Sequence, residues 1–196
     1  MKKNKSNNFK NTTAVILAGG RGRRMGGKDK GLLIWEKEPL ITHTYKRIKP
    51  QVNQVIVSCN RNFNLYKNLV DVFVADDRDG YCGPLAGIEA ACNLLLSDYA
   101  IVIPCDAPSL PLDLVERLIH PLETQKNVEV TYAWDGLRSQ FLFTAIRSEV
   151  LSSITTCLDA GGRSLKDWHS YVKTCEVDFS DKINAFENIN YESQLR

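Results

Sequence analysis

Four short, almost continuously apolar runs recur along the chain, with stretches of helical spacing between them. The runs cover residues 13–17, 54–58, 71–75 and 100–104. Runs of this length and apolarity are typical of strands buried on both faces of a parallel sheet. The predicted helices between and after them cover residues 40–49, 84–96 and 112–120. Because strands and helices alternate, we expect an α/β fold with a mostly parallel, Rossmann-like sheet and helices on both faces.

The pattern changes after residue 127. Two apolar segments, 128–134 and 141–146, flank Asp135 and Gly136, a pair typical of a hairpin turn. We therefore expect an antiparallel addition to the sheet in the C-terminal half. Two further helices are predicted, over residues 151–159 and 165–171.

Length and composition are those of one ordinary globular domain. The chain has 196 residues, of which 43% are hydrophobic and 24% are charged. Since no linker is long enough to separate two domains, residues 12–196 are expected to form a single three-layer domain. Residues 1–11, rich in Asn and Lys, are expected to be a disordered basic leader.

Charge and hydropathy argue against several classes of partner. Residues 1–30 carry nine Lys or Arg residues and one acid, and such a basic arm can indicate nucleic-acid binding. No aromatic residue is interleaved with the loop charges for base stacking, however, so no nucleic-acid partner is expected. No apolar run is long enough to span a membrane, and the N-terminus lacks the apolar core of a secretion signal. We therefore expect no membrane association and a cytoplasmic location.

The loop directly after the first run carries the strongest chemical signal. Residues 17–31 contain six glycines and five Lys or Arg residues. Glycine lets the backbone approach a ligand closely, and successive backbone N–H groups can form a concave anion site. Basic side chains then offset charge that the amides cannot. Together these properties indicate a polyphosphate ligand.

Two common phosphate-binding loops do not fit this segment. The dinucleotide-binding fingerprint, counted from Gly20, requires a third glycine where Met25 stands. The P-loop pattern is nearly met, but Asp29 takes the place of the hydroxyl residue that binds magnesium. We therefore interpret the P-loop match as a coincidence in a glycine-rich loop.

Polar residues follow the other three runs where the strands are expected to end: Asn60, Asp76 and Asp106. In open parallel sheets ligands bind beyond the carboxyl ends of the strands, so these residues and the glycine loop are expected to share one site. A carboxylate beside a polyphosphate requires a cation between them. Because Mg²⁺ binds one or two carboxylates together with substrate phosphates, Asp106 is the predicted Mg²⁺ ligand.

Each of these residues also has a purely structural interpretation. Asp106 could be a helix N-cap, Asp76 a solvated turn acid, and Asn60 a residue that tolerates a left-handed turn. In the functional interpretation, Asp76 pairs with two adjacent N–H donors, as on a guanine edge, or accepts from a ribose hydroxyl.

Taken together, these segments resemble the bacterial molybdenum cofactor guanylyltransferases. The motifs that carry the resemblance are Leu-Ala-Gly-Gly from Leu17, Arg-Met-Gly-Gly from Arg24, Asp-Lys-Gly from Asp29, Cys-Asn-Arg from Cys59, Gly-Pro-Leu-Ala-Gly from Gly83 and Pro-Cys-Asp-Ala-Pro from Pro104. The tail over residues 177–190 matches as well, so the resemblance runs from about Thr13 to the C-terminus. The basic glycine loop is quite specific, whereas Leu-Ala-Gly-Gly alone fits many nucleotidyltransferases.

The resemblance implies a Mg²⁺-dependent enzyme that joins GMP from GTP to the terminal phosphate of molybdopterin and releases pyrophosphate. It implies nucleotide binding by Leu17, Ala18, Gly19, Lys30, Asn60, Asp76 and Asp106, with Mg²⁺ on Asp106. It also implies that Asn188 and Asn190 lie near the pterin. We expect Asp106, Lys30 and Arg24 to act in catalysis. We also expect the protein to make transient contact with molybdoenzymes or their chaperones.

Other function classes remain open. A cytidylyltransferase or sugar-phosphate nucleotidyltransferase on the same scaffold would prefer CTP or UTP to GTP. A regulatory P-loop GTP-binding module would release inorganic phosphate instead of pyrophosphate, although Asp29 argues against it. A nucleic-acid binder that uses the basic arm would bind DNA or RNA directly.

Overall fold

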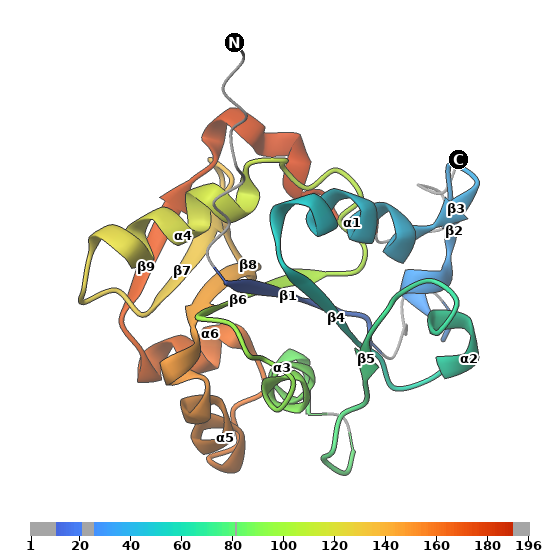
Figure 1. Cartoon of the computed structure of the whole chain (residues 1–196), viewed down its shortest axis with the longest axis horizontal. Coiled ribbons are helices and arrows are strands. Elements are labelled where there is room, and N and C mark those ends of the chain that lie inside the picture. Colours follow the sequence, from blue (N-terminus) through green and yellow to red (C-terminus); the bar gives the residue numbers. More distant parts are fainter. Residues whose placement is uncertain (1–10, 21–25, 81, 190–196) are drawn as a thin grey trace.

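The main sheet is the centre of the molecule (Figure 1). The computed structural model describes residues 11–20, 26–80 and 82–189, which leaves nearly all of the predicted leader outside the described residues. Within these ranges the sheet has seven strands, in the order β5 (Phe73–Val74), β4 (Gln54–Ser58), β1 (Thr12–Leu17), β6 (Tyr99–Pro104), β8 (Ser139–Arg147), β7 (Val130–Trp134) and β9 (Thr174–Asp178). All neighbours pair in parallel except that β8 is antiparallel to β6 and β7. The predicted fold class, with its antiparallel addition, is confirmed.

Helices cover both faces of the sheet (Figure 1), and the interior strand β1 accordingly has apolar residues on both sides. Ala14 and Ile16 of β1 belong to one core cluster, and Val15 between them belongs to the other. On the first face lie α1 (Leu40–Ile48) and α4 (Leu114–Thr124), and on the second lie α3 (Pro84–Cys92), α5 (Ser152–Asp159) and α6 (Leu165–Trp168). The sheet is therefore the middle of three layers.

The sequence patterns do not predict the shorter elements. These are β2 (Ile34–Trp35), β3 (Glu38–Pro39), α2 (Phe63–Tyr66), β9, η2 (Lys30–Leu32), η3 (Lys49–Gln51), η4 (Ser148–Val150) and η6 (Ser180–Phe186). A further short helix, η5 (His169–Tyr171), falls within the predicted helix over 165–171. Most of these elements have too few residues to leave a periodic pattern, and β9, at the edge of the sheet, has no buried residue. Several of them nevertheless contribute to the site described below.

Some predicted boundaries are wrong. The helix predicted to end at residue 120 continues through Pro121 to Thr124. Leu118 and Leu122, on either side of the proline, are fully buried, so packing on the sheet outweighs the missing backbone hydrogen bond. In contrast, α3 and β5 are shorter than predicted, and the helix over 165–171 divides into α6 and η5. None of the helices in the described residues is long and apolar enough to cross a membrane.

Candidate active site

The carboxyl ends of four neighbouring strands bring the predicted site residues to one edge of the sheet. Strand pairing continues just past β1, where the Ala18 N–H donates to the Ser58 carbonyl (2.7 Å). On the other side, the Cys105 N–H donates to the Leu17 carbonyl (3.1 Å). The segment over residues 17–19 therefore lies between the residues that follow β4 and those that follow β6.

A pocket of about 210 Å³ opens at this edge. It is lined by Leu17, Gly19, Gly20, Ser58, Asp76, Gly83, Pro84, Gly87, Pro104 and Leu142. Two of its glycines are required by close packing: a Cβ on Gly19 would lie 3.0 Å from Asn60 Nδ2, and one on Gly87 would collide with Ser58 Oγ. Much of the wall is thus bare backbone, which a flat ligand can approach closely. Asp76 is the one carboxylate among these lining residues.

Asp76 of the pocket lining and its neighbour Asn60 hold each other in a reciprocal pair. Asn60 Nδ2 donates to Asp76 Oδ2 (2.8 Å), and the Asp76 N–H donates to Asn60 Oδ1 (2.9 Å). Ser58 Oγ lies 3.5 Å from Asp76 Oδ1. Burial raises the pKa of Asp76, and the hydrogen bonds from Asn60 and Ser58 oppose this shift. The pair therefore presents an oriented carboxylate that protonates more readily than an exposed one.

Lys30 and Asp106 form an ion pair beside the pocket, near Pro104 of its lining. Asp106 is only 4% exposed, whereas the Lys30 side chain is 24% exposed. The pair joins η2 to the turn after β6, so it bridges the glycine loop and the central sheet. A cation and a buried carboxylate at one point are suited to binding a phosphate and its counter-ion.

The chain's tail returns to the same place. The Ile189 N–H donates to the carbonyl oxygen of Asp106 (3.2 Å). Upstream, Phe186 packs edge-to-face on Phe143 and Phe179, which fixes the approach of the tail to the sheet. The predicted site residue Asn188 is therefore brought next to the Asp106 turn, while Asn190 lies outside the described residues.

Asp29 has a role that the sequence did not reveal. Its carboxylate is buried and accepts hydrogen bonds from Tyr66 Oη (2.8 Å) and Asn62 Nδ2 (2.9 Å). It points into the α2 segment and anchors the end of the glycine loop there. The acid that departs from the P-loop pattern thus has a structural role. The only sequence signal for this role is a carboxylate at the position where the P-loop pattern requires a hydroxyl.

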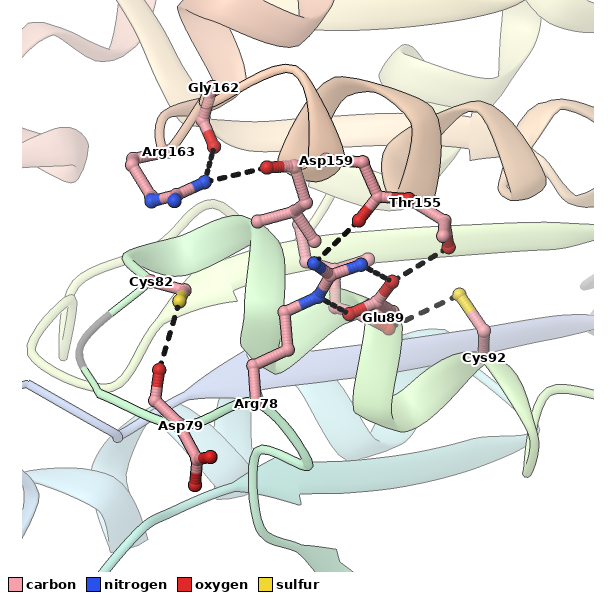
Figure 2. Close-up of polar contacts among 11 residues, drawn as sticks. Arg78, Asp79, Cys82, Glu89, Cys92, Thr155, Asp159, Gly162 and Arg163 are labelled. Carbon is pink, nitrogen blue, oxygen red and sulfur yellow. Dashed lines mark hydrogen bonds and ion pairs between the residues drawn. The ribbon is translucent and has the colours of Figure 1, made fainter.

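Arg78, two residues after Asp76 of the pocket lining, ties this segment to two helices (Figure 2). Its guanidinium pairs with both carboxylate oxygens of Glu89 on α3 (2.5 and 2.7 Å) and with Asp159 on α5 (2.8 Å). Thr155 adds a hydrogen bond to Glu89 (2.7 Å). The hydrogen bond from Arg78 holds the pKa of Glu89 below its usual value. This network is a second feature that no sequence motif indicated.

Asp106 is the side chain at this edge that suits a divalent metal ion. Within the described part of the chain, no group of three or more His, Cys, Asp or Glu side chains gathers as a ready-made metal site. Asp106 offers a single buried carboxylate beside the pocket. This suits Mg²⁺, which commonly takes one protein carboxylate and completes its octahedron with phosphate and water oxygens.

Not every predicted residue can be placed. Arg24, expected to act in catalysis, and Asn190, expected near the pterin, lie outside the described residues. The others come together at one edge: Leu17, Ala18, Gly19, Lys30, Asn60, Asp76, Asp106 and Asn188. Their common position makes this edge the candidate active site.

Sequence comparisons point to one family. The family described as MobA-like NTP transferase domain matches residues 14–173. The molybdenum cofactor guanylyltransferase of Shewanella sediminis is 42% identical over 181 residues, covering 92% of each chain. The protein of the same name from Shewanella piezotolerans is 43% identical over 184 residues, covering 92% of this chain and 88% of the relative.

Solved structures share the fold at much lower identity. The molybdopterin-guanine dinucleotide biosynthesis protein A of Archaeoglobus fulgidus has a TM-score of 0.77 at 20% identity, covering 93% of this chain and 94% of that one. The 4-diphosphocytidyl-2C-methyl-D-erythritol synthase of Anaerococcus prevotii has a TM-score of 0.68 at 10% identity, covering 95% of each chain. Since their names include guanine and cytidyl groups respectively, the fold by itself does not select the nucleobase.

Proposed function

This chain belongs to the MobA-like NTP transferases and, within them, to the molybdenum cofactor guanylyltransferases, and from this we propose its reaction. It transfers GMP from GTP to the terminal phosphate of molybdenum-molybdopterin, forming the molybdopterin guanine dinucleotide and pyrophosphate. The observation that carries the proposal is the pocket at the carboxyl edge of β1, with Asp76 on its wall and the Lys30–Asp106 pair beside it.

The pocket supports one orientation of GTP. The base and ribose lie against the bare backbone of Gly19, with Asn60 and Asp76 beside the guanine edge. The backbone from Leu17 to Gly19 follows the sugar and the first phosphate. The remaining phosphates then extend toward Lys30, where positive charge is available.

The chemical step needs little covalent help from the protein. An oxygen of the pterin phosphate forms a bond to the α-phosphorus of GTP, and the bond from that phosphorus to the oxygen bridging the β-phosphate breaks. Because the attacking oxygen already carries negative charge, no protein base has to remove a proton. Alignment of the two phosphates and stabilisation of charge are the main tasks.

Lys30 and Asp106 divide these tasks. Lys30 supplies positive charge to the departing pyrophosphate, a role that Arg24 is expected to share. Asp106 would hold Mg²⁺, which, when bound, offsets negative charge on the phosphate oxygens. Asn188 and Asn190 would contact the pterin half, which is consistent with the hydrogen bond that holds the tail to Asp106. Release of the product to molybdoenzymes or their chaperones, in the cytoplasm, completes the proposal.

The test is product identification. The protein is incubated with α-labelled GTP, Mg²⁺ and molybdopterin, and we expect the label to appear in a pterin dinucleotide with an equal amount of pyrophosphate. Unlabelled GTP should suppress labelling far better than CTP or UTP. Preferential use of CTP would support a cytidylyltransferase, and release of inorganic phosphate without an acceptor would support a GTP hydrolase. Either outcome would reject the proposal.

Replacement of Asp76 by asparagine is expected to raise the KM for GTP about 10- to 100-fold, because one oxygen that accepts from the guanine edge becomes a donor. ITP, which lacks the 2-amino group, should lose much less, so the preference for GTP over ITP should fall. Asp77→Asn, which changes the exposed neighbouring acid, is the control. An unchanged GTP/ITP preference would instead assign Asp76 to the ribose.

The same carboxylate makes GTP binding sensitive to acid. Burial raises the pKa of Asp76, so its charged form is present above that raised pKa and is lost as the pH falls through it. A neutral carboxyl group cannot accept two N–H donors. We therefore expect the KM for GTP to rise on the acid side in the wild type and to lose this dependence in Asp76→Asn. Measuring both proteins at each pH cancels the titration of GTP itself.

A further inference from the structure

One arginine that the proposed mechanism does not use reaches from the segment after β4 to the glycine loop. Arg61 Nη1 donates to the carbonyl of Gly27 (2.7 Å), and Nη2 donates to those of Lys28 (2.9 Å) and Gly20 (3.3 Å). Its Nε lies 3.7 Å from Asp29 Oδ2. A single guanidinium thus connects residues on both sides of the loop.

Because peptide groups are planar, the hydrogen bonds to the loop carbonyls also fix the direction of neighbouring backbone N–H groups. In a planar trans peptide the C=O and N–H bonds point in opposite directions. With the carbonyls of Gly27 and Lys28 directed at Arg61, the N–H groups of Lys28 and Asp29 point away from it. Gly27 has a φ of 81°, a left-handed conformation that a larger residue would adopt only with strain.

Side-chain hydrogen bonds also hold the end of the glycine loop at Asp29. Asn62 and Tyr66, which follow Arg61 along the chain, hold the buried carboxylate of Asp29. The segment after β4 therefore holds the loop twice: Arg61 binds its carbonyls, and its neighbours bind the side chain at its end. This anchoring leaves Arg61 a defined position from which to orient the loop.

We propose that Arg61 is the positioning residue of the glycine loop. By holding the loop carbonyls on its own side, it directs the amides to the opposite side, where they can face an anion. The identity of that anion, the triphosphate of GTP, rests on the proposed function. All three guanidinium nitrogens are directed at the loop, so Arg61 acts through the backbone and does not contact the phosphates itself.

The test compares Arg61→Lys with Arg61→Ala. A lysine keeps the charge but has one nitrogen in place of the two that reach the loop carbonyls in a fixed planar fork, so both variants should behave alike. In the absence of nucleotide, the Lys28 and Asp29 amides, whose peptide groups Arg61 holds, should exchange hydrogen faster in both, while β1 amides keep their protection. The KM for GTP should rise by roughly tenfold to 100-fold, with kcat at saturating GTP changed less than about threefold.

Arg147→Lys is the matched control. Arg147 also donates to backbone carbonyls, those of Val128 and Leu122, but it pairs with Tyr99 at the opposite end of β6. It should lose stability and keep its KM for GTP. Wild-type behaviour of Arg61→Lys would show that charge alone matters and would overturn the proposal, as would equal losses in kcat and kcat/KM.

The proposed function and the proposed role of Arg61 can be rejected independently of each other. If the wild type transfers no GMP, the proposed function is rejected, yet the exchange measurement still judges the role of Arg61. Unchanged protection of the loop amides in Arg61→Ala would overturn that role even in a fully active guanylyltransferase.

Discussion

Replacement of Asp106 by asparagine is expected to lower kcat by about 1,000-fold or more while the fold is retained, because a metal-held charge at the reacting phosphates is worth several kcal/mol. Asparagine has nearly the same shape, and its oxygen can still accept from Lys30. The hydrogen bond that holds Ile189 uses the backbone carbonyl of residue 106 and is unaffected. The variant therefore removes charge with little change in packing.

The measurement is kcat at saturating substrates over a range of Mg²⁺ concentrations, with circular dichroism and thermal unfolding as tests of the fold. If Asp106 holds the ion, half-saturation by Mg²⁺ should shift to higher concentration in the variant. Asp113→Asn, which changes an acid beside Arg117 on α4, is the control and should keep full turnover. Full activity of Asp106→Asn, or an unshifted Mg²⁺ dependence, would reject the metal role.

Replacement of Lys30 by methionine is expected to lower kcat by about 100- to 1,000-fold, the usual effect of removing one preorganised group that stabilises developing charge. Methionine retains most of the length of the side chain and removes only the ammonium group. The change also leaves the buried carboxylate of Asp106 without this cation, so the free energy of unfolding should fall by up to about 3 kcal/mol.

A second substitution separates these two effects. In Lys30→Met with Asp106→Asn, the uncompensated charge is gone, so thermal stability should return toward that of Asp106→Asn while turnover stays low. Lys46→Met, which breaks an exposed pair with Glu38, is the control for loss of a lysine and should leave turnover unchanged. A Lys30→Met enzyme with normal kcat would remove Lys30 from the chemical step.

The common location of the polar residues that follow the strands could be predicted from the sequence. Asn60, Asp76 and Asp106 each follow an apolar run, and parallel strands bring such positions to one edge of a sheet. The short runs also predicted the order of layers, since β1 has apolar residues on both sides. Boundaries were less predictable where packing opposed a local signal, as where α4 continues through Pro121.

The contacts that organise the edge could not be predicted in the same way. From the sequence, Asp29 is only the residue that breaks the P-loop pattern, but in the structure it is bound by Asn62 and Tyr66 of a segment with no periodic pattern of its own. Arg61 carried no signal beyond its place in a short motif, and its three carbonyl partners lie in the glycine loop. Backbone carbonyls are the same in every residue, so no side-chain pattern identifies which of them a distant arginine will bind.

By itself, the sequence determined the α/β fold class, the basic and glycine-rich character of the loop after β1, and the strand ends at which to look for acids. These depend on local apolar periodicity and on residue chemistry, both of which are written along the chain. Only the tertiary structure decided that Lys30 pairs with Asp106, that the tail returns to this pair and that Arg61 binds carbonyls of the glycine loop. Such contacts join distant segments, and their geometry is set by how the connecting elements pack against one sheet, which no local pattern records.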